Sequence, residues 1–196
     1  MEVILMNILI IYAYPNTTGY THAILNTIQQ GIEQQNTVKT IDLYKENFDP
    51  VLVFNKSKRR RDMQFDKETA VYREQISWAD HIVFIFPIWW GGMPAILKGF
   101  IDKVFSKGFA YSYKGLFPIG LLTGKSAWII TTEDAPKVYK TLFQQDYGTV
   151  LKKQVLRMSG IKKVKHFSFS SLKNSNEKQR QVFLNKLFTR SSKLTA

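Results

Sequence analysis

Two adjacent tryptophans followed by two glycines form the most unusual segment of the chain. Trp89 and Trp90 come shortly after the apolar run 81–86, and Gly91 and Gly92 follow them. A tryptophan face suits stacking against a flat conjugated ring, and glycines let the backbone approach that ring and donate hydrogen bonds to its edge. The same residues are typical of two packed aromatics beside a turn, so the segment alone favours neither interpretation.

A second segment suited to ligand binding is the hydroxyl-rich loop 14–21, which contains Thr17, Thr18 and Thr21 and leads into a helical pattern. Free amides and the positive end of the helix dipole make a helix N-terminus a natural phosphate site, and threonine hydroxyls add donors. The loop is also typical of an ordinary turn with a threonine cap, which spacing alone favours. Its position directly after the first predicted strand favours the phosphate site.

The third candidate segment, 131–136, contains two threonines and the carboxylates of Glu133 and Asp134 after a strand-like run. Small polar groups there can contact a bound ring. The two carboxylates are favoured at a helix N-terminus by the dipole, so a helix cap explains them. Tyr139 follows one helical turn later and faces either the site or solvent, because periodicity does not decide between the two.

Composition excludes several kinds of chemistry. The chain has no cysteine, which excludes disulfides, thiolate nucleophiles and cysteine-based metal sites. Its three histidines, His22, His81 and His166, lie far apart in sequence, so we expect no catalytic metal and infer that redox chemistry needs an organic cofactor. The sequence contains no run of about 18 apolar residues and no signal-peptide pattern, so we expect a cytoplasmic protein.

The formal net charge of +13 favours anionic partners. The densest basic run, 56–61, contains no aromatic residue, and we therefore expect no nucleic-acid binding. We hypothesise that some of the excess charge attracts a phosphate-rich dinucleotide, which the salt dependence of the nicotinamide Michaelis constant would test. The other basic positions are typical of solvated faces: Lys152, Lys153, Lys162, Lys163 and Lys165.

Strands and helices alternate along the chain. Short apolar and β-branched runs predict five buried strands, at 7–12, 38–43, 81–86, 126–132 and 164–170. Apolar residues at helical spacing predict helices around the stripe Ile24, Ile28 and Ile32, and over 69–79, 94–105, 136–158 and 175–189. We expect one domain, 1–196, with a long basic loop at 44–66 and a flexible tail at 190–196.

This alternation predicts an α/β fold, a three-layer sandwich in which helices cover both faces of a five-stranded parallel sheet. Five such strands favour the flavodoxin-like order 2-1-3-4-5. Ligands of this fold bind outside the carboxyl ends of the strands, near the point where the strand order reverses. The loops after the first, third and fourth strands are therefore expected to meet at one site.

The stretch 86–105 (FPIWWGGMPAILKGFIDKVF), together with 108–111 (GFAY), 120–127 (GLLTGKSA) and the threonine pair at 131–132, carries a family resemblance. The chain resembles the NAD(P)H dehydrogenase (quinone) or DT-diaphorase-like proteins of flavodoxin fold, in particular their small bacterial branch. The likeness covers nearly all of residues 6–170 and is most specific between 84 and 132.

The resemblance implies noncovalent FAD or FMN, NADH or NADPH as cosubstrate, two-electron ping-pong transfer to a quinone-like acceptor, and a homodimer. It implies that Tyr139 stabilises the reduced flavin or the substrate oxygen. The segment that matches the phosphate loop comprises Thr18, Gly19, Tyr20 and Thr21. The positions that match the ring contacts, with the amides of 88–90 and of the 132–133 turn as donors, are Pro87, Ile88, Trp89, Trp90, Gly91, Thr131, Thr132 and Glu133.

Several positions depart from the family pattern. Tyr14 replaces a histidine, Gly19 a serine and Thr21 a frequent asparagine, which weakens side-chain contacts to the flavin phosphates. The pair 133–134 replaces two glycines and adds negative charge near a flavin edge that becomes anionic on reduction. Gln145 replaces the catalytic histidine, which puts a tyrosine–histidine proton relay in doubt.

Two other functions compete with the enzyme. The first is an electron carrier, or an ancillary subunit that associates peripherally with a membrane cation-efflux protein. Carrier flavodoxins are typically acidic and lack the helix that begins at Pro94, which favours the enzyme. The second is a nucleic-acid binder using 56–61, which predicts salt-sensitive DNA binding and a colourless protein.

Overall fold

Five parallel strands form the central sheet of the protein, which a computed structural model describes over residues 5–33, 35–142 and 146–194. The strands stand in the order β2, β1, β3, β6, β7, which is the predicted 2-1-3-4-5 order once a separate hairpin is set aside. Each strand lies within one residue of its predicted bounds. The observed bounds are β1 Asn7–Tyr12, β2 Thr37–Asp42, β3 His81–Pro87, β6 Ser126–Thr132 and β7 Lys163–Phe169.

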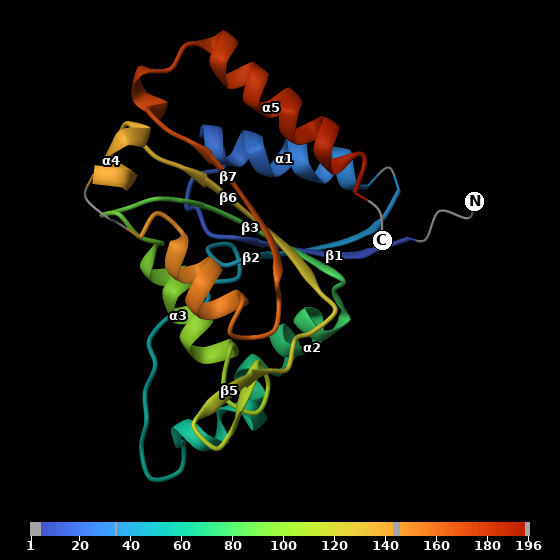
Figure 1. Ribbon diagram of the computed structural model, residues 1–196, viewed down its shortest axis with the longest axis vertical. Helices are drawn as coiled ribbons and strands as arrows, with labels where there is room; N and C mark the ends of the chain where they lie inside the picture. The colour runs from blue at the N-terminus through green and yellow to red at the C-terminus, as the bar shows by residue number, and fades with distance from the viewer. Residues whose placement is uncertain (1–4, 34, 143–145, 195–196) are drawn as a thin grey trace.

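Helices cover both faces of the sheet and complete the three layers (Figure 1). The four longest are α1 Tyr20–Ile32, α2 Ala70–Trp78, α3 Ala95–Val104 and α5 Glu177–Ser191, each in a predicted helical segment. α1 and α5 lie side by side on one face, whereas α2 and α3 lie on the other. α1 and α5 approach so closely that the Ser191 side chain fills the space where a Cβ at Gly31 would lie.

The strand sequences explain why both faces are covered. Successive side chains of a strand point to opposite faces, so a strand buried on both sides is apolar throughout. Ile8 and Ile10 of β1 belong to the core under α1 and α5. Leu9 and Ile11 belong to the core under α2 and α3. All seven residues of β3 are buried, which places this strand at the centre of the fold.

The single helix predicted over 136–158 is wrong. The structure has a short helix, α4 (Lys137–Leu142), and a separate π-helical segment at Leu151–Leu156. Tyr147 and Gly148 precede the second segment with φ of 39° and 85°. These left-handed conformations do not continue a right-handed helix, so the helical path is interrupted there. Gln145 lies outside the described residues.

A two-stranded antiparallel hairpin was not predicted. It comprises β4 (Tyr111–Lys114) and β5 (Phe117–Gly120), joined at Gly115, whose φ is 62°. The strands have four residues each and β5 is largely exposed, so neither gives the buried apolar run by which the sheet strands were found. Leu116 and Phe117 at the tip of the hairpin are exposed.

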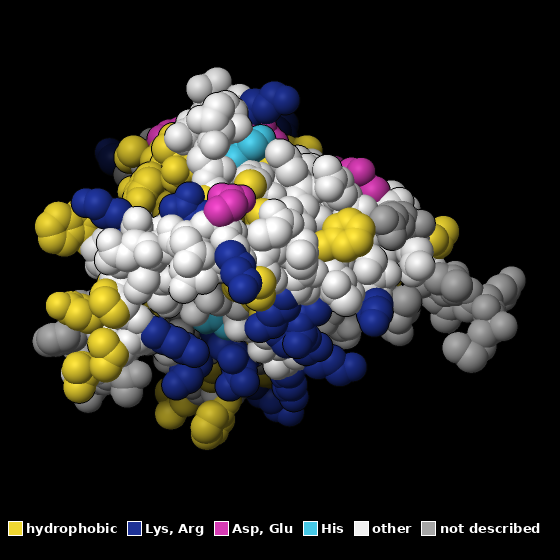
Figure 2. Space-filling model, turned by 90° about the horizontal axis from the view of Figure 1, so that it is seen from above, with side chains coloured by type: hydrophobic (Ala, Val, Ile, Leu, Met, Phe, Trp, Pro, Cys, Tyr) yellow, Lys and Arg dark blue, Asp and Glu magenta, His cyan; other side chains and the backbone are white. Residues whose placement is uncertain are grey.

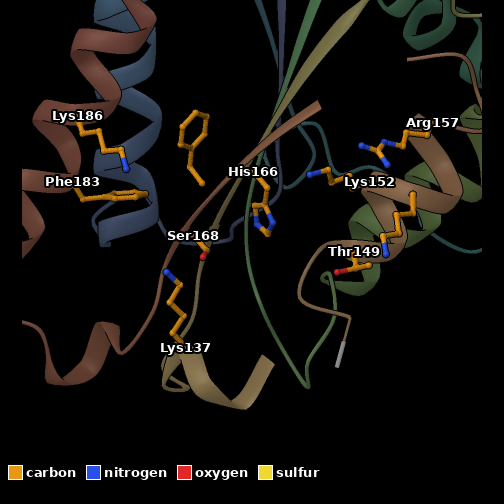
Figure 3. Close-up of a pocket in the computed structure, with 10 residues that line it drawn as sticks. Lys137, Thr149, Lys152, Arg157, His166, Ser168, Phe183 and Lys186 are labelled. Carbon is orange, nitrogen blue, oxygen red and sulfur yellow. The ribbon is translucent and has the colours of Figure 1, made fainter. Parts of the chain in front are cut away.

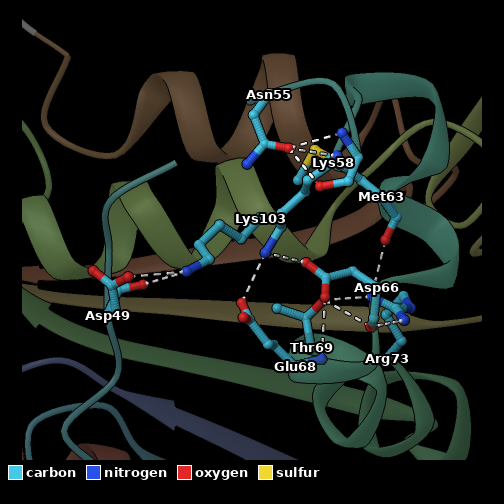
Figure 4. A network of polar contacts seen from close by, with 10 residues as sticks. Asp49, Asn55, Lys58, Met63, Asp66, Glu68, Thr69, Arg73 and Lys103 are labelled. Atoms are coloured by element: carbon cyan, nitrogen blue, oxygen red, sulfur yellow. Dashed lines mark hydrogen bonds and ion pairs between the residues drawn. The ribbon is translucent and has the colours of Figure 1, made fainter. Parts of the chain in front are cut away.

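Carboxylates neutralise part of the basic run in the predicted loop 44–66 (Figure 4). Lys58 Nζ lies 2.8 Å from both Asp66 Oδ2 and Glu68 Oε2, and Arg59 Nε lies 2.6 Å from Asp62 Oδ2. The run also enters a 3-10 helix at Arg60–Phe65. Two of the five basic residues of this run are therefore paired with carboxylates in the folded protein.

The C-terminal helix reaches further than predicted. α5 continues through Arg190 to Ser191, which is buried, and the Leu194 carbonyl accepts a hydrogen bond from Asn36 Nδ2 at 3.0 Å. The predicted flexible tail, 190–196, thus begins inside a helix, and residues 195–196 lie outside the described ones. No helix in the described part of the chain is long and apolar enough to cross a membrane.

Candidate functional site

The loops that follow β1, β3 and β6 meet at one cavity, as the topology predicts. The cavity has a volume of about 130 Å³ and opens at the carboxyl ends of these strands. Its walls also include Leu172, from the turn after β7. The residues that line it from the three loops are Tyr14, Thr21, Pro87, Ile88, Trp89, Thr132, Glu133 and Asp134.

Thr132 at the end of β6 joins the three loops. Its hydroxyl lies 2.8 Å from the hydroxyl of Thr21 in α1, and both residues are buried. Its carbonyl accepts a hydrogen bond from the Ile88 amide at 2.8 Å. These two contacts fix the spacing between the α1 N-terminus and the segment that follows β3.

The tryptophan segment forms a tight turn that projects outward. Trp89 and Gly92 donate amide hydrogen bonds to each other's carbonyls at 2.9 and 3.0 Å. Trp90 and Gly91 between them have φ of 50° and 74°. Trp89 is 42% exposed and Trp90 is fully exposed. The interpretation of these residues as packed core aromatics is therefore wrong, since both rings remain accessible to a ligand or a partner.

Several amides predicted to contact a bound ring are already used inside the protein. The Ile88, Trp89 and Glu133 amides donate to Thr132, Gly92 and Phe169 carbonyls. In the described part of the chain, the amides of Trp90 and Gly91 have no acceptor. The prediction that the Ile88, Trp89 and Glu133 amides donate to a bound ring is thus corrected. The Trp90 amide is the remaining candidate among the predicted donors.

The N-terminus of α1 is open to an anion. Gly19 is its N-cap residue, and this helix has neither a side-chain cap nor an acidic residue in its first turn. The Thr18 amide and hydroxyl both donate to Asn16 Oδ1 at 2.8 Å. The Tyr20 hydroxyl donates to the Arg180 carbonyl at 2.9 Å, and burial raises the pKa of this phenol. The amide and the hydroxyl of Thr18 are therefore both engaged within the loop, whereas Tyr20 offers its backbone amide to the site and has only its side chain engaged elsewhere.

Tyr14 and Gly19, two of the departures from the family pattern, lie against each other. A Cβ at position 19 would lie 2.8 Å from Tyr14 Oη and 3.0 Å from Tyr14 Cε1. The backbone at Gly19, with φ of −83° and ψ of 171°, suits any residue, so the conformation does not require glycine. The Tyr14 ring occupies the space that a side chain at position 19 would need, which links the two departures.

The two acidic residues after β6 hold the turn that follows β7. The Ser170 hydroxyl donates to Glu133 Oε1 at 2.6 Å, and the Lys173 amide donates to Asp134 Oδ1 at 3.1 Å. Their interpretation as helix caps is therefore wrong, because both carboxylates contact the segment 170–173. Glu133 is buried at the cavity wall and brings negative charge there.

Thr131 turns its side chain away from the cavity. The residue is fully buried, and its hydroxyl lies 2.9 Å from Nε2 of His166 in the neighbouring strand β7. Thr131 is therefore not among the residues that line the cavity, whereas the adjacent Thr132 is. This difference follows from the alternation of side chains along a strand.

Tyr147 is the functional candidate that the sequence did not reveal. Its amide donates to the Gly91 carbonyl at 2.8 Å, so it supports the tryptophan turn, and the residue is buried. Burial raises the pKa of its phenol, and the charge of Glu133 and the phenol of Tyr139 raise it further. Tyr139 itself is 44% exposed on α4. The signal that could have revealed Tyr147 is the glycine after it, which is typical of an interrupted helix.

Comparison with known proteins agrees with this geometry. Residues 6–188 match the protein family described as flavodoxin-like fold. A Haemophilus influenzae protein named uncharacterized NAD(P)H oxidoreductase is 40% identical over 123 residues, 61% of this chain and 60% of that protein. NAD(P)H dehydrogenase [quinone] 1 of Cavia porcellus is 31% identical over 150 residues, 67% of this chain and 54% of that protein. The chain thus matches only 54–60% of the length of these two relatives.

The fold comparison extends over nearly the whole chain. The crystal structure of a Streptococcus mutans protein is 49% identical, with a TM-score of 0.92, and the match covers 96% of this chain and 100% of that one. The sheet order, the three loops at the carboxyl ends of the strands and the sequence match agree. The chain belongs to the flavodoxin-like fold family.

Proposed function

We propose that the protein is a flavin-dependent NAD(P)H oxidoreductase that reduces quinones or similar acceptors by two electrons. The observation that carries this proposal is the single cavity at which an open helix N-terminus, an exposed tryptophan turn and the end of β6 meet. Relatives named NAD(P)H oxidoreductase and NAD(P)H dehydrogenase [quinone] support it over a role as an electron carrier or ancillary efflux subunit.

The residues at this cavity fit a flavin nucleotide. The amides at the start of α1 suit its phosphate, since no acidic side chain of that helix's first turn opposes an anion there. The accessible faces of Trp89 and Trp90 suit its ring. When bound, the flavin supplies hydride transfer from the nicotinamide to the acceptor, and FMN and FAD both meet this requirement.

The protein would contribute positioning and proton supply. The Thr21–Thr132 hydroxyl pair holds the phosphate loop at a fixed distance from the end of β6, and Tyr147 holds the tryptophan turn through Gly91. Tyr139 is the proposed proton donor or anion stabiliser, because its phenol is partly accessible. Glu133 places a negative charge near the ring, which disfavours an anionic reduced form and lowers the reduction potential.

We further propose that the protein acts in the cytoplasm as a homodimer. Large apolar side chains are exposed on the tryptophan turn at Trp90, on α4 at Val138 and Leu142, and, away from the site, on the hairpin at Leu116 and Phe117. Exposed apolar surface of this extent is more typical of an interaction site than of the solvent-facing surface of a monomer. Light scattering after size-exclusion chromatography tests the dimer, and a single species of one chain would contradict it.

One experiment tests the enzyme directly. The purified protein is denatured, the released flavin is identified as FMN or FAD, and NADH and NADPH oxidation is measured with menadione as acceptor. We expect one flavin per chain and oxidation that depends on the quinone. A colourless protein that does not oxidise either nicotinamide after incubation with FMN or FAD would refute the proposal.

A further inference from the structure

Positive charge is concentrated in the last quarter of the chain. Residues 147–196 contain 12 lysines and arginines and one acidic residue, Glu177, whereas residues 1–146 contain 16 and 14. The last 50 residues thus carry +11 of the formal net charge of +13. These residues form the π-helical segment, β7 and α5, all of which contribute to one hollow. Lysines and arginines gather densely on one side of the molecule (Figure 2).

A hollow at the exposed edge of β7 collects five of the cations in the molecule. It has a volume of about 500 Å³, within the range of small-molecule sites. Its cations come from three elements, and Figure 3 shows the labelled side chains Lys137, Lys152, Arg157 and Lys186 around the space in front of β7. The five cations are Lys137 of α4, Lys152, Lys153 and Arg157 around the π-helical segment, and Lys186 of α5.

Among the residues that the structure describes, no acidic one lines this hollow. Across the described ranges, none of the five cations forms an ion pair, in contrast to Lys58 and Arg59 of the basic loop. Like charges held together without counter-charges repel one another and destabilise the folded state. An anion bound in the hollow would offset this repulsion.

The remaining lining residues suit a ligand with phosphate groups. Thr149 and Ser168 supply hydroxyls, and His166 of β7 contributes a ring. Phe183 forms a half-buried apolar wall, tilted against Phe169 with ring centroids 5.2 Å apart. None of the residues that line this hollow lines the cavity at the carboxyl ends of β1, β3 and β6. The two sites are therefore separate.

We propose that this hollow binds a small-molecule anion with two or more phosphate groups. Lysine ammonium groups act as point charges for phosphate and arginine offers a planar fork, and both form charge-assisted hydrogen bonds. Five cations on several sides match an anion that presents charge in several directions, which one phosphate does less well. The Phe183 wall suits an organic portion, so a nucleotide and free pyrophosphate are the two sources to compare.

Isothermal titration of the flavin-loaded protein with sodium pyrophosphate and with adenosine 5′-diphosphate tests the proposal. We expect saturable binding of one molecule per chain and clearly weaker binding of inorganic phosphate. The double variant Lys152→Gln, Lys186→Gln is expected to bind pyrophosphate at least about tenfold more weakly, since it loses two charge-assisted contacts. Tighter binding of the nucleotide than of pyrophosphate would identify the nucleotide as the source.

The matched control removes the same charge elsewhere. Lys56 and Lys67 are exposed and form no ion pair in the described structure, so the variant Lys56→Gln, Lys67→Gln is expected to keep its pyrophosphate affinity within about twofold. An equal loss in both variants would show a bulk charge effect and overturn the proposal. The absence of saturable pyrophosphate binding, or tighter binding of a 20-nucleotide single-stranded DNA than of either small anion, would also overturn it.

Discussion

The contact between Tyr14 and Gly19 predicts a specific coupling between two positions of the phosphate loop. In the variant Gly19→Ala the new Cβ would lie 2.8 Å from Tyr14 Oη, closer than side chains pack, so the Tyr14 ring has to move. Tyr14 lines the cavity, and the displaced ring changes the shape of that cavity. Gly19→Ala is therefore expected to weaken flavin binding although the backbone at position 19 tolerates alanine.

The size of the effect follows from the displacement of one ring. Moving a side chain about 30° from its preferred rotamer costs roughly 0.5–1.5 kcal/mol, which corresponds to an affinity loss of about 2- to 10-fold. When Tyr14 is already alanine, the obstacle is absent, and Gly19→Ala should change the affinity by less than about 1.5-fold. The double-mutant cycle is then non-additive.

Fluorescence titration of FMN and FAD into the flavin-free form of each of the four proteins measures this cycle. Thermal unfolding of the same proteins without flavin reports whether the substitutions affect folding rather than binding. Gly19→Ala is compared in two backgrounds, one with Tyr14 and one with Tyr14→Ala. If it lowers the flavin affinity equally in both, within about 0.3 kcal/mol, the reasoning is refuted.

Three further predictions concern the proton chemistry, the pH dependence of stability and the packing of the helices. Tyr139→Phe should lower quinone turnover about 10- to 100-fold without loss of flavin, whereas Tyr147→Phe should change turnover less than tenfold. Stopped-flow kinetics measures both rates, and unchanged turnover in Tyr139→Phe would show that Tyr139 is neither proton donor nor anion stabiliser. Burial and Lys165 lower the pKa of His81 from 6.5 to about 4, so the unfolded chain binds the proton more readily, and about 3 kcal/mol of stability is lost as pH falls from 6.5 to 4. Urea unfolding across this range should give a shallower pH dependence for His81→Gln, and equal slopes would contradict the assignment. Gly31→Ala should destabilise the protein by about 1–3 kcal/mol through its clash with Ser191, and a gain in melting temperature would show that α1 and α5 are not in such close contact.

The fold was predictable because its strands are buried on both faces. Such strands are short continuous apolar runs, and β1 and β3 were located within one residue from that pattern. The prediction of one helix over 136–158 failed because the periodicity of apolar residues does not report the sign of the backbone angle φ. Tyr147 and Gly148 have left-handed backbone conformations that interrupt the helix, and no proline marks the interruption in the sequence.

The candidate site was predictable in its location but not in its hydrogen bonds. Topology placed the three loops together, but the acceptors of the Ile88 and Glu133 amides depend on distant parts of the chain, Thr132 and Phe169. The charged surface shows the same limit. The run 56–61 is conspicuous in sequence and partly neutralised in space, whereas the cations beside β7 are dispersed in sequence and converge only on folding.

The lysines of β7 also affect how the protein behaves at high concentration. β7 is the last strand of the sheet in the described part of the chain, so its outer backbone groups lie at an edge and could pair with the edge of another molecule. Lys163 and Lys165 are exposed on this strand, and they would bring like charges together if two copies joined there. The edge is thereby protected against open-ended strand addition, and surface engineering that removes these two lysines would expose the protein to aggregation.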